Sequence, residues 1–198
     1  MPTDNSVKAM NQEPRKFVLL DRDGTINEEC YYLSDPAQIS LIPGAVEGLR
    51  QLMALGLGLV VITNQSAIGR GFFDEHRLTW IHKRLCDLLG AQGVILDGIY
   101  FCPHTPEDGC SCRKPRTGLI ERAAQELGFD PRESFVIGDK PCDVEMGQQV
   151  GATSILVRTG YGAQVESREE VAANYIVDDL RAAAGIIRTL VIPQARLR

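Results

Sequence analysis

Phe17-Val18-Leu19-Leu20-Asp21-Arg22-Asp23-Gly24-Thr25 is the stretch on which the fold and the chemistry of this chain depend. Its apolar half is typical of a buried strand, and the strand ends in two acids. Residues two apart on an extended chain point to the same side, so Asp21 and Asp23 should lie close together. Two such carboxylates repel each other unless one holds a proton or a cation lies between them. Taken alone, the stretch is equally compatible with a polar turn.

Beyond this stretch, short apolar runs alternate with amphipathic segments along the chain. Short apolar runs bounded by polar clusters are typical of buried strands, whereas apolar residues three or four apart predict helices. The alternation predicts an α/β fold, a Rossmann-like three-layer sandwich with a mostly parallel central sheet and helices on both faces. We expect further strands at 59–62, 99–101, 134–137, 154–157 and 175–177, and helices at 43–56, 74–90, 117–128, 143–150 and 179–190.

Particular residues indicate the helical spacing of the first of these segments and the first residue of two later helices. Val46, Leu49 and Met53 recur at helical spacing and predict the buried face of the first helix. Asp74 and Thr117 stand directly before later helices, where a side-chain oxygen commonly accepts a hydrogen bond from a free backbone N–H. We therefore expect both to cap the helices that follow them.

The composition is that of an ordinary globular domain. The chain has 198 residues, of which 44% are hydrophobic and 24% charged, and this length suits one domain with a sizeable core. We expect a single domain over residues 17–191, between a flexible N-terminal tail at 1–16 and a C-terminal tail at 192–198. The longest apolar stretch, 52–62, contains two glycines and is shorter than the roughly 20 residues of a membrane-spanning helix.

The charge balance narrows the classes of partner. A formal net charge of −5 disfavours nucleic-acid binding, for which a basic face would be expected. Residues 1–16 lack the apolar core of a secretory signal, so we expect a cytoplasmic protein with no membrane partner, and a monomer rather than an oligomer. In that compartment the six cysteines are expected to be thiols or metal ligands rather than disulfides.

A second strand ends in an acid, at Gly138-Asp139-Lys140. The carboxyl ends of parallel strands lie at one edge of the sheet, so Asp139 should meet Asp21 there. Two hard carboxylates at one point predict Mg²⁺. Lys114 would then help to hold a phosphoryl group and neutralise its charge. We assign Asp21 as the nucleophile that attacks phosphorus and Asp23 as the general acid and base.

A cysteine-rich loop follows the strand expected at 99–101. Three sulfurs and one imidazole within eleven residues predict a structural zinc site, whose four protein ligands leave no position for water. A disulfide is the competing interpretation, although Cys-x-Cys spacing fits disulfide geometry poorly. The other cysteines are expected to be ordinary thiols, and His76 and His82 to be surface residues. The four proposed ligands are Cys102, His104, Cys110 and Cys112.

Four ordered motifs resemble those of the haloacid dehalogenase superfamily of phosphatases. They are Asp21-Arg-Asp-Gly-Thr, Thr63, Lys114 and Gly138-Asp139-Lys140-Pro-Cys-Asp143, and the resemblance extends from Phe17 to about Gly160. Within the superfamily, the zinc loop and Arg113-Lys114-Pro115 resemble the branch that holds the histidinol-phosphate phosphatases and the D-glycero-D-manno-heptose 1,7-bisphosphate 7-phosphatases. The segments 21–27 and 63–71 are more similar to the heptose enzymes, whereas both groups share the zinc spacing.

The resemblance implies a division of roles among the matching residues. Asp21 would form an aspartyl-phosphate, and Thr63 and Lys114 would hold the phosphate. Mg²⁺ would bind the carboxylates of Asp21 and Asp139 and the backbone carbonyl of Asp23. A large cap domain is not expected in such an enzyme. The loops that would shape the pocket for a phosphorylated sugar are 26–42, 65–73 and 102–113.

The implied reaction is removal of the 7-phosphate from D-glycero-D-manno-heptose 1,7-bisphosphate, a precursor of the lipopolysaccharide core. A sugar bisphosphate needs a cation at a distance from the cleaved phosphate, and Arg70 and Arg113 are both available for that contact. The remaining candidate substrate contacts, which follow two expected strands, are Asn64, Gln65, Ser66 and Lys140.

Alternative functions remain open at this stage. The stretch Glu28-Glu29-Cys30-Tyr31-Tyr32 has no close counterpart in the heptose enzymes, so the sugar is not settled and histidinol phosphate is the alternative substrate. A zinc-stabilised phosphosugar-binding module without catalysis is a second alternative, but such a binder would not need a nucleophile beside an acid. A nucleic-acid 3′-phosphatase is disfavoured by the acidic net charge.

Overall fold

A six-stranded parallel sheet forms the centre of the molecule, in a computed structural model that describes residues 14–192. The tails expected at 1–16 and 192–198 therefore lie mostly outside the described residues. The strand order is β3-β2-β1-β4-β5-β6, and every neighbouring pair is parallel. The strands are β1 (Phe17–Leu20), β2 (Gly58–Asn64), β3 (Gly98–Cys102), β4 (Phe135–Gly138), β5 (Thr153–Val157) and β6 (Tyr175–Val177).

The strand order reverses between β1 and β4. The chain first builds the sheet outward from β1 to β3, then returns and builds it outward from β4 to β6 on the other side. At this reversal the N–H of Asp21 donates to the carbonyl of Ile137 at 2.9 Å. Ligands of such sheets bind in the crevice outside the carboxyl ends of the strands, where the order reverses.

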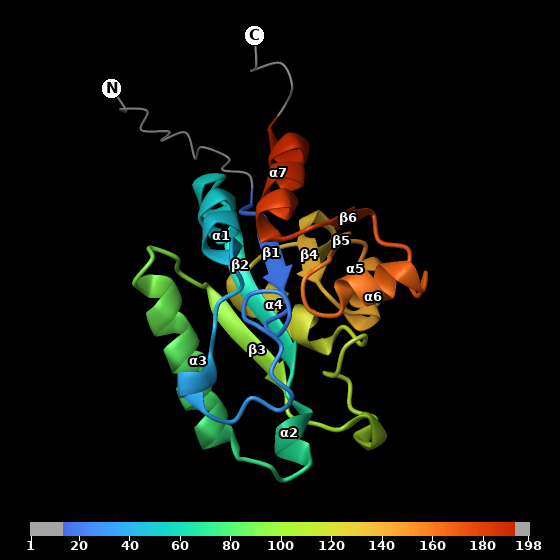
Figure 1. Ribbon diagram of the computed structural model, residues 1–198. Helices are drawn as coiled ribbons and strands as arrows, with labels where there is room; N and C mark the ends of the chain where they lie inside the picture. The colour runs from blue at the N-terminus through green and yellow to red at the C-terminus, as the bar shows by residue number, and fades with distance from the viewer. Residues whose placement is uncertain (1–13, 193–198) are drawn as a thin grey trace, which may run out of the picture.

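Helices cover both faces of the sheet, which confirms the expected three-layer sandwich. Side chains of α1, α3 and α7 pack into one core cluster, and those of α4 and α5 contribute to the cluster on the opposite face. Figure 1 shows this arrangement, with α1 and α7 side by side. The helices are α1 (Ala45–Ala54), α2 (Ser66–Gly69), α3 (Glu75–Gly90), α4 (Gly118–Leu127), α5 (Pro141–Gln149), α6 (Gly162–Ser167) and α7 (Leu180–Val191), with 3₁₀ turns at Pro36–Gln38, Pro106–Asp108 and Pro131–Glu133.

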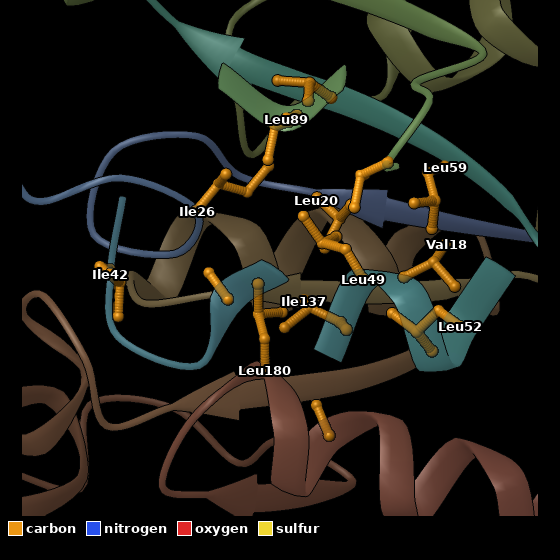
Figure 2. Close-up of a cluster of buried hydrophobic side chains, with 14 of the residues drawn as sticks. Val18, Leu20, Ile26, Ile42, Leu49, Leu52, Leu59, Leu89, Ile137 and Leu180 are labelled. Atoms are coloured by element: carbon orange, nitrogen blue, oxygen red, sulfur yellow. The ribbon is translucent and has the colours of Figure 1, made fainter. Parts of the chain in front are cut away.

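The short apolar runs form strands that are buried on both faces. Along β1, Val18 and Leu20 point into the core cluster beneath α1 and α7, while Phe17 and Leu19 point into the other. Figure 2 shows Val18 and Leu20 among side chains of the first cluster, including Leu49 of α1. A strand that is covered on both faces needs a continuous apolar run, because alternate residues point in opposite directions.

The buried face of α1 is wider than the spacing of its large apolar residues indicates. Val46 and Met53 are half-buried and pack against the same core cluster as Leu49, and Gly48 and Leu52 are buried. Gly48 lies so close to the backbone of Leu180 that a side chain there would overlap it. The helix is therefore turned to bring its glycine against α7, a contact that the spacing of large apolar residues does not reveal.

The two expected helix caps have different outcomes. Asp74 caps α3 as predicted, because its carboxylate accepts a hydrogen bond from the N–H of Arg77 at 2.9 Å. Thr117 precedes α4, but its hydroxyl bonds Glu121 Oε1 at 2.6 Å and makes no capping hydrogen bond. The Thr117 prediction was wrong because Glu121, one turn into the helix, competes for the hydroxyl.

All the helices and strands described for residues 14–192 belong to this one sandwich, so no large cap domain is present in that range. The polypeptide between β1 and α1 is instead a loop with one 3₁₀ turn. None of the described helices has the length and apolar character needed to cross a bilayer.

Candidate active site

A tight turn after β1 carries Asp21 and Asp23 to the edge of the sheet. Gly24 has a left-handed backbone (φ 85°), and its N–H donates to the carbonyl of Asn27 at 2.7 Å. A side chain at Gly24 would overlap the carboxylate of Asp139, at the end of β4. The turn thus packs the end of β1 directly against the end of β4.

Lys114 binds the buried carboxylate at the end of β1. Its Nζ lies 2.8 Å from Asp21 Oδ1, 2.6 Å from Asp143 Oδ1 and 2.8 Å from the carbonyl oxygen of Ile62. Burial opposes the positive charge, but the carboxylates of Asp143 and Asp21 outweigh it and raise the pKa of Lys114 well above its ordinary value. The side chain is therefore a fixed, charged ammonium beside Asp21.

Three buried carboxylates, from Asp21, Asp139 and Asp143, offer ligand oxygens within 4.8 Å of one another. Asp139 Oδ2 accepts a hydrogen bond from the N–H of Tyr161 at 2.8 Å, whereas its Oδ1 is buried with no hydrogen-bond partner. Burial and the neighbouring charge of Asp21 raise the pKa of Asp139 to about 8. The ion-pair partner of Asp139 Oδ1, Lys140 Nζ, is 3.9 Å away, and such an oxygen among hard carboxylate ligands fits Mg²⁺, which would relieve this repulsion.

Asp23 lies in a different environment from the other acids. Arg22 donates from Nε to Asp23 Oδ1 at 3.0 Å and from Nη2 to Oδ2 at 2.7 Å. The side-chain amides of Asn27 and Gln65 each donate to the same carboxylate at 2.9 Å. Burial alone would raise the pKa of Asp23, but the charge and hydrogen bonds of Arg22 prevail and lower it. Asp23 is thus ionised and held in one orientation.

The end of β2 fastens the cysteine-rich loop to the site. Asn64 Oδ1 accepts from the backbone N–H of Lys114 at 3.1 Å, and Asn64 Nδ2 donates to the Lys114 carbonyl at 3.3 Å. Thr63 is buried, and its hydroxyl accepts from Gln65 Nε2 at 2.9 Å. This part of the site therefore depends on β2 as well as on the loop itself.

The three sulfurs and one imidazole of the cysteine-rich loop converge on one point. Their separations are 3.6 Å for Cys102 to Cys110, 3.1 Å for Cys102 to Cys112, 3.4 Å for Cys110 to Cys112, and 3.3 Å from Cys112 Sγ to His104 Nδ1. A tetrahedral zinc ion about 2.3 Å from each sulfur would hold the sulfurs about 3.8 Å apart. The arrangement therefore fits zinc, and all six cysteines are free, in contrast to the disulfide alternative.

A cleft of about 220 Å³ opens beside Asp23. It contains four of the expected substrate contacts, Asn64, Gln65, Ser66 and Lys140, and on the loop after β1 it is lined by Glu29 and by Cys30 to Leu33. Lys140 Nζ forms an ion pair with Glu29 at 2.7 Å and lies 5.2 Å from the ring centre of Tyr161, which also lines the cleft.

The two expected arginines lie outside this lining. Arg113 donates to the carbonyl of His104 at 3.0 Å and lines a separate hollow beside the cysteine-rich loop. Arg70 is exposed at the end of α2. Either arginine would therefore reach the substrate only at the rim of the cleft.

Comparison with known proteins identifies the family. The HAD-hydrolase-like family profile matches residues 111–183. The D-glycero-beta-D-manno-heptose-1,7-bisphosphate 7-phosphatase of Pasteurella multocida (strain Pm70) is 37% identical over 183 residues, which cover 89% of this chain and 98% of the relative. The chain belongs to the haloacid dehalogenase (HAD) superfamily of phosphatases.

Two further comparisons describe its neighbours within the HAD superfamily. The crystal structure of D,D-heptose 1,7-bisphosphate phosphatase from B. bronchiseptica, complexed with magnesium and phosphate, matches with a TM-score of 0.83 and 31% identity over 88% of this chain and 99% of that one. The histidine biosynthesis bifunctional protein HisB of Legionella pneumophila (strain Lens) is 35% identical over 86% of this chain but only 47% of its own length.

Several features of this HAD site were not predicted. Asp143 belongs to the fourth motif, but the sequence alone assigns it no role, and in the structure it pairs with Lys114. Arg22 belongs to the first motif, and its side chain pairs with the adjacent Asp23. Tyr161 follows β5, and the sequence assigns no site residue to the carboxyl end of that strand. His82, expected at the surface, is half-buried: its Nε2 is buried without a hydrogen-bond partner, and burial lowers the pKa of the ring to about 3.

Proposed function

We propose that this HAD phosphatase removes the 7-phosphate of D-glycero-D-manno-heptose 1,7-bisphosphate. The observation that carries the proposal is the buried pair of Lys114 Nζ and Asp21 Oδ1, 2.8 Å apart, beside a second pair in which Arg22 orients Asp23. A fixed cation next to one carboxylate and a separately held second carboxylate suit phosphoryl transfer through a covalent intermediate. The similarity to heptose bisphosphate phosphatases supports the substrate.

In the proposed reaction, an oxygen of Asp21 attacks phosphorus and the bond from phosphorus to the sugar oxygen breaks. Lys114, already beside Asp21, neutralises charge on the phosphoryl oxygens. The Thr63 hydroxyl, at the end of β2, is a further phosphate contact. Water then hydrolyses the aspartyl-phosphate and regenerates Asp21.

Asp23 would supply and remove the protons. The carboxyl group is ionised in the free enzyme, since Arg22 lowers its pKa. A bound anionic phosphate would raise that pKa again, so that Asp23 can protonate the departing sugar oxygen. The same carboxylate is then able to take a proton from the attacking water.

Mg²⁺ is the metal that the acidic cluster fits. The carboxylates of Asp21 and Asp139 would hold it with the backbone carbonyl of Asp23, and Asp143 is a further candidate because it belongs to the same cluster. When bound, the ion supplies charge stabilisation of the phosphoryl group. We also propose that Zn²⁺ occupies the Cys102, His104, Cys110 and Cys112 site in a purely structural role.

A phosphate-release assay over a panel of phosphate esters tests the substrate. We expect kcat/KM for heptose bisphosphate to exceed that for histidinol phosphate at least on the order of tenfold, because one charge-assisted contact contributes roughly 1.5 to 3 kcal/mol. Equal or reversed preference would overturn the heptose assignment in favour of histidinol phosphate, for which the similarity to HisB is the supporting observation.

Variants at the rim arginines identify the contact to the phosphate that is not cleaved. Arg113→Ala is expected to lower the ratio of kcat/KM for heptose bisphosphate to kcat/KM for histidinol phosphate. Arg70→Ala tests whether the arginine at the end of α2 makes this contact instead. Arg84 is exposed on α3, and Arg84→Ala is the matched control that should leave the preference unchanged. If neither rim variant narrows the preference, neither arginine binds the second phosphate.

Asp21→Asn tests the covalent route directly. The amide keeps the shape but is a poor nucleophile, so turnover should be abolished with the fold intact, whereas Asp23→Asn could retain slow phosphorylation of Asp21 by activated esters. Near-normal turnover of Asp21→Asn would exclude the aspartyl-phosphate. Loss of phosphatase activity in both variants, with phosphosugar binding retained, would also exclude a purely non-catalytic binder.

We propose that the protein acts as a cytoplasmic monomer, with a single domain over residues 17–191 and tails at 1–16 and 192–198. Arg15 and Lys16, from the end of the first tail, already contact the domain through ion pairs with Asp97 and Glu133. Light scattering after size-exclusion chromatography tests the monomer, since a particle of twice the chain mass of 21.8 kDa would contradict it.

A further inference from the structure

Three aromatic side chains from two loops meet beside the cleft that contains Asp23. Tyr31 and Tyr32, on the loop after β1, line that cleft, whereas Phe72, which follows α2, does not line it and lies against Tyr32. The rings of Tyr31 and Tyr32 are 4.4 Å apart in an edge-to-face arrangement, and the rings of Tyr32 and Phe72 are 4.7 Å apart. These separations are those of interacting aromatic pairs, so the two loops are joined by their rings.

The aromatic group does not belong to the hydrophobic core. Tyr31 is 82% exposed and Phe72 60% exposed, and Tyr161 on the other side of the cleft is 39% exposed. Large apolar side chains gathered at one exposed place, rather than scattered singly, mark a binding surface. Here the tyrosines of the group line a cleft that also contains Asp23.

The backbone at Tyr32 supports this interpretation. Tyr32 has a left-handed conformation (φ 55°), which is unfavourable for a bulky residue and persists only where the surrounding structure imposes it. Glu29, three residues before Tyr32, pairs with Lys140 at 2.7 Å. The ring of Tyr32 itself lies against Phe72. The segment 29–32 is thus held by contacts to two other parts of the chain.

We propose that Tyr31, Tyr32 and Phe72 form an aromatic clasp that binds the ring of the sugar substrate and selects cyclic sugar phosphates over acyclic ones. This inference rests on the proposed function, because it assumes a phosphate ester with its phosphate near Asp23. A sugar ring has an apolar face of C–H groups and an edge of hydroxyls. The clasp matches the face, and the polar side chains of Asn64, Gln65 and Ser66 in the same cleft match the hydroxyls.

An aromatic group can also stack a nucleobase. A nucleoside monophosphate such as AMP is therefore the competing ligand, and a comparison of AMP with sugar phosphates as substrates distinguishes the two.

The test compares Tyr32→Ala and Phe72→Ala with the unmodified enzyme on three substrates: heptose bisphosphate, the acyclic ester glycerol 3-phosphate, and AMP. The expected result is that KM for the cyclic sugar rises about five- to tenfold while kcat changes little, in line with loss of an aromatic contact. The ratio of kcat/KM for the cyclic sugar to that for glycerol 3-phosphate should fall by at least about fivefold. Tyr32→Phe keeps the rings and should restore the ratio.

Trp80→Ala is the matched control, because Trp80 is an exposed aromatic residue (66%) on α3 that does not line the cleft. Melting temperatures of all variants separate a binding defect from a folding defect. An unchanged ratio in folded Tyr32→Ala and Phe72→Ala would overturn the clasp. So would a selective loss of AMP hydrolysis, which would assign the rings to a base.

The outcomes also separate this inference from the proposed function. If the unmodified enzyme prefers another cyclic sugar phosphate, and the clasp variants lose that preference, the clasp stands although the heptose assignment fails. If heptose bisphosphate is the preferred substrate and the variants retain the preference, the clasp fails and the proposed function stands.

Discussion

Lys114 neutralises two buried carboxylates at once, so its removal should affect both catalysis and stability. In Lys114→Met, Asp21 and Asp143 would be left as unpaired buried charges, which costs several kcal/mol unless they bind protons. We expect kcat to fall on the order of a thousandfold and the free energy of unfolding to fall by about 3 kcal/mol. Lys83→Met is the control, since Lys83 forms an exposed pair with Asp87 and should change stability by less than about 0.5 kcal/mol. Similar losses in both variants would contradict a special role for Lys114.

His82 predicts a pH dependence of stability. Burial lowers the pKa of the folded ring to about 3 from 6.5, so the folded protein holds a neutral ring where the unfolded chain would bind a proton. The stabilisation is therefore complete above pH 6.5 and is lost progressively as the pH falls toward 3. The slope approaches about 1.4 kcal/mol per pH unit below the unfolded pKa.

Urea unfolding between about pH 7.5 and 5 measures this slope. In His82→Gln the slope should be smaller by nearly the contribution of one proton, while the contributions of all other groups remain. An equal slope in both proteins would mean that His82 titrates normally in the folded state.

Gly160 lies where a side chain cannot fit. It has a left-handed backbone (φ 55°), and a Cβ would overlap both the carboxylate of Asp139 and the backbone of Gly24. Gly160→Ala should therefore reduce the free energy of unfolding by more than about 2 kcal/mol and weaken Mg²⁺ binding. Gly185 in α7 has open space around it, and Gly185→Ala should instead stabilise by about 0.5 to 1 kcal/mol. Chemical denaturation and Mg²⁺ titration measure both effects.

For single residues, the sequence reveals the acids at the ends of strands but not the residues that bind those acids. Asp21 and Asp139 could be predicted to meet, because parallel strands place their carboxyl ends together. A role for Arg22 could not be assigned, because its partner in the structure is the adjacent residue Asp23. The backbone N–H of Tyr161 donates a hydrogen bond to Asp139. The residue type at position 161 does not indicate such a backbone contact.

The cysteine-rich loop is the element whose stability should depend on metal. Between Cys102 and Cys112 the structure describes only one 3₁₀ turn, so a bound zinc ion would supply much of what holds the loop. Cys110→Ser should lower zinc content from about one per chain, and lower melting temperature and activity together, because Lys114 follows Cys112 closely. Elemental analysis measures the zinc content, thermal unfolding the melting temperature, and phosphate release the activity. Full activity after complete zinc removal would contradict the proposed link.

The strands and the long helices were predictable from the sequence, and the short helices were not. Each of the six expected strands forms, with boundaries that shift by at most two residues. The four-residue α2 and the six-residue α6 were missed, because helices of that length have too few turns to show a period. The family resemblance implies that the loop 26–42 shapes the pocket, but not the partners that hold it there, such as Lys140 and Phe72.

For the whole molecule, Mg²⁺ should act as a stabilising ligand. The cluster of Asp21, Asp139 and Asp143 fits this ion, and an ion that binds only the folded state raises stability by mass action. At ten times the dissociation constant the gain is about 1.4 kcal/mol, or roughly 3 to 6 °C for a domain of this size. Asp139→Asn should remove most of the shift. Thermal unfolding with and without Mg²⁺ decides this, and an equal shift in the variant would place the ion elsewhere.

The partners at the site come from distant parts of the chain. Asp21 and Lys114 are 93 residues apart, and the hydroxyl of Thr159 bonds the carbonyl of Gly24 across 135 residues. Loops of that length close slowly, so we expect contacts across them to form after β1 has paired with both β2 and β4. Enzymatic activity regained during refolding should therefore follow completion of the central sheet, and lag behind signals that report helix formation alone.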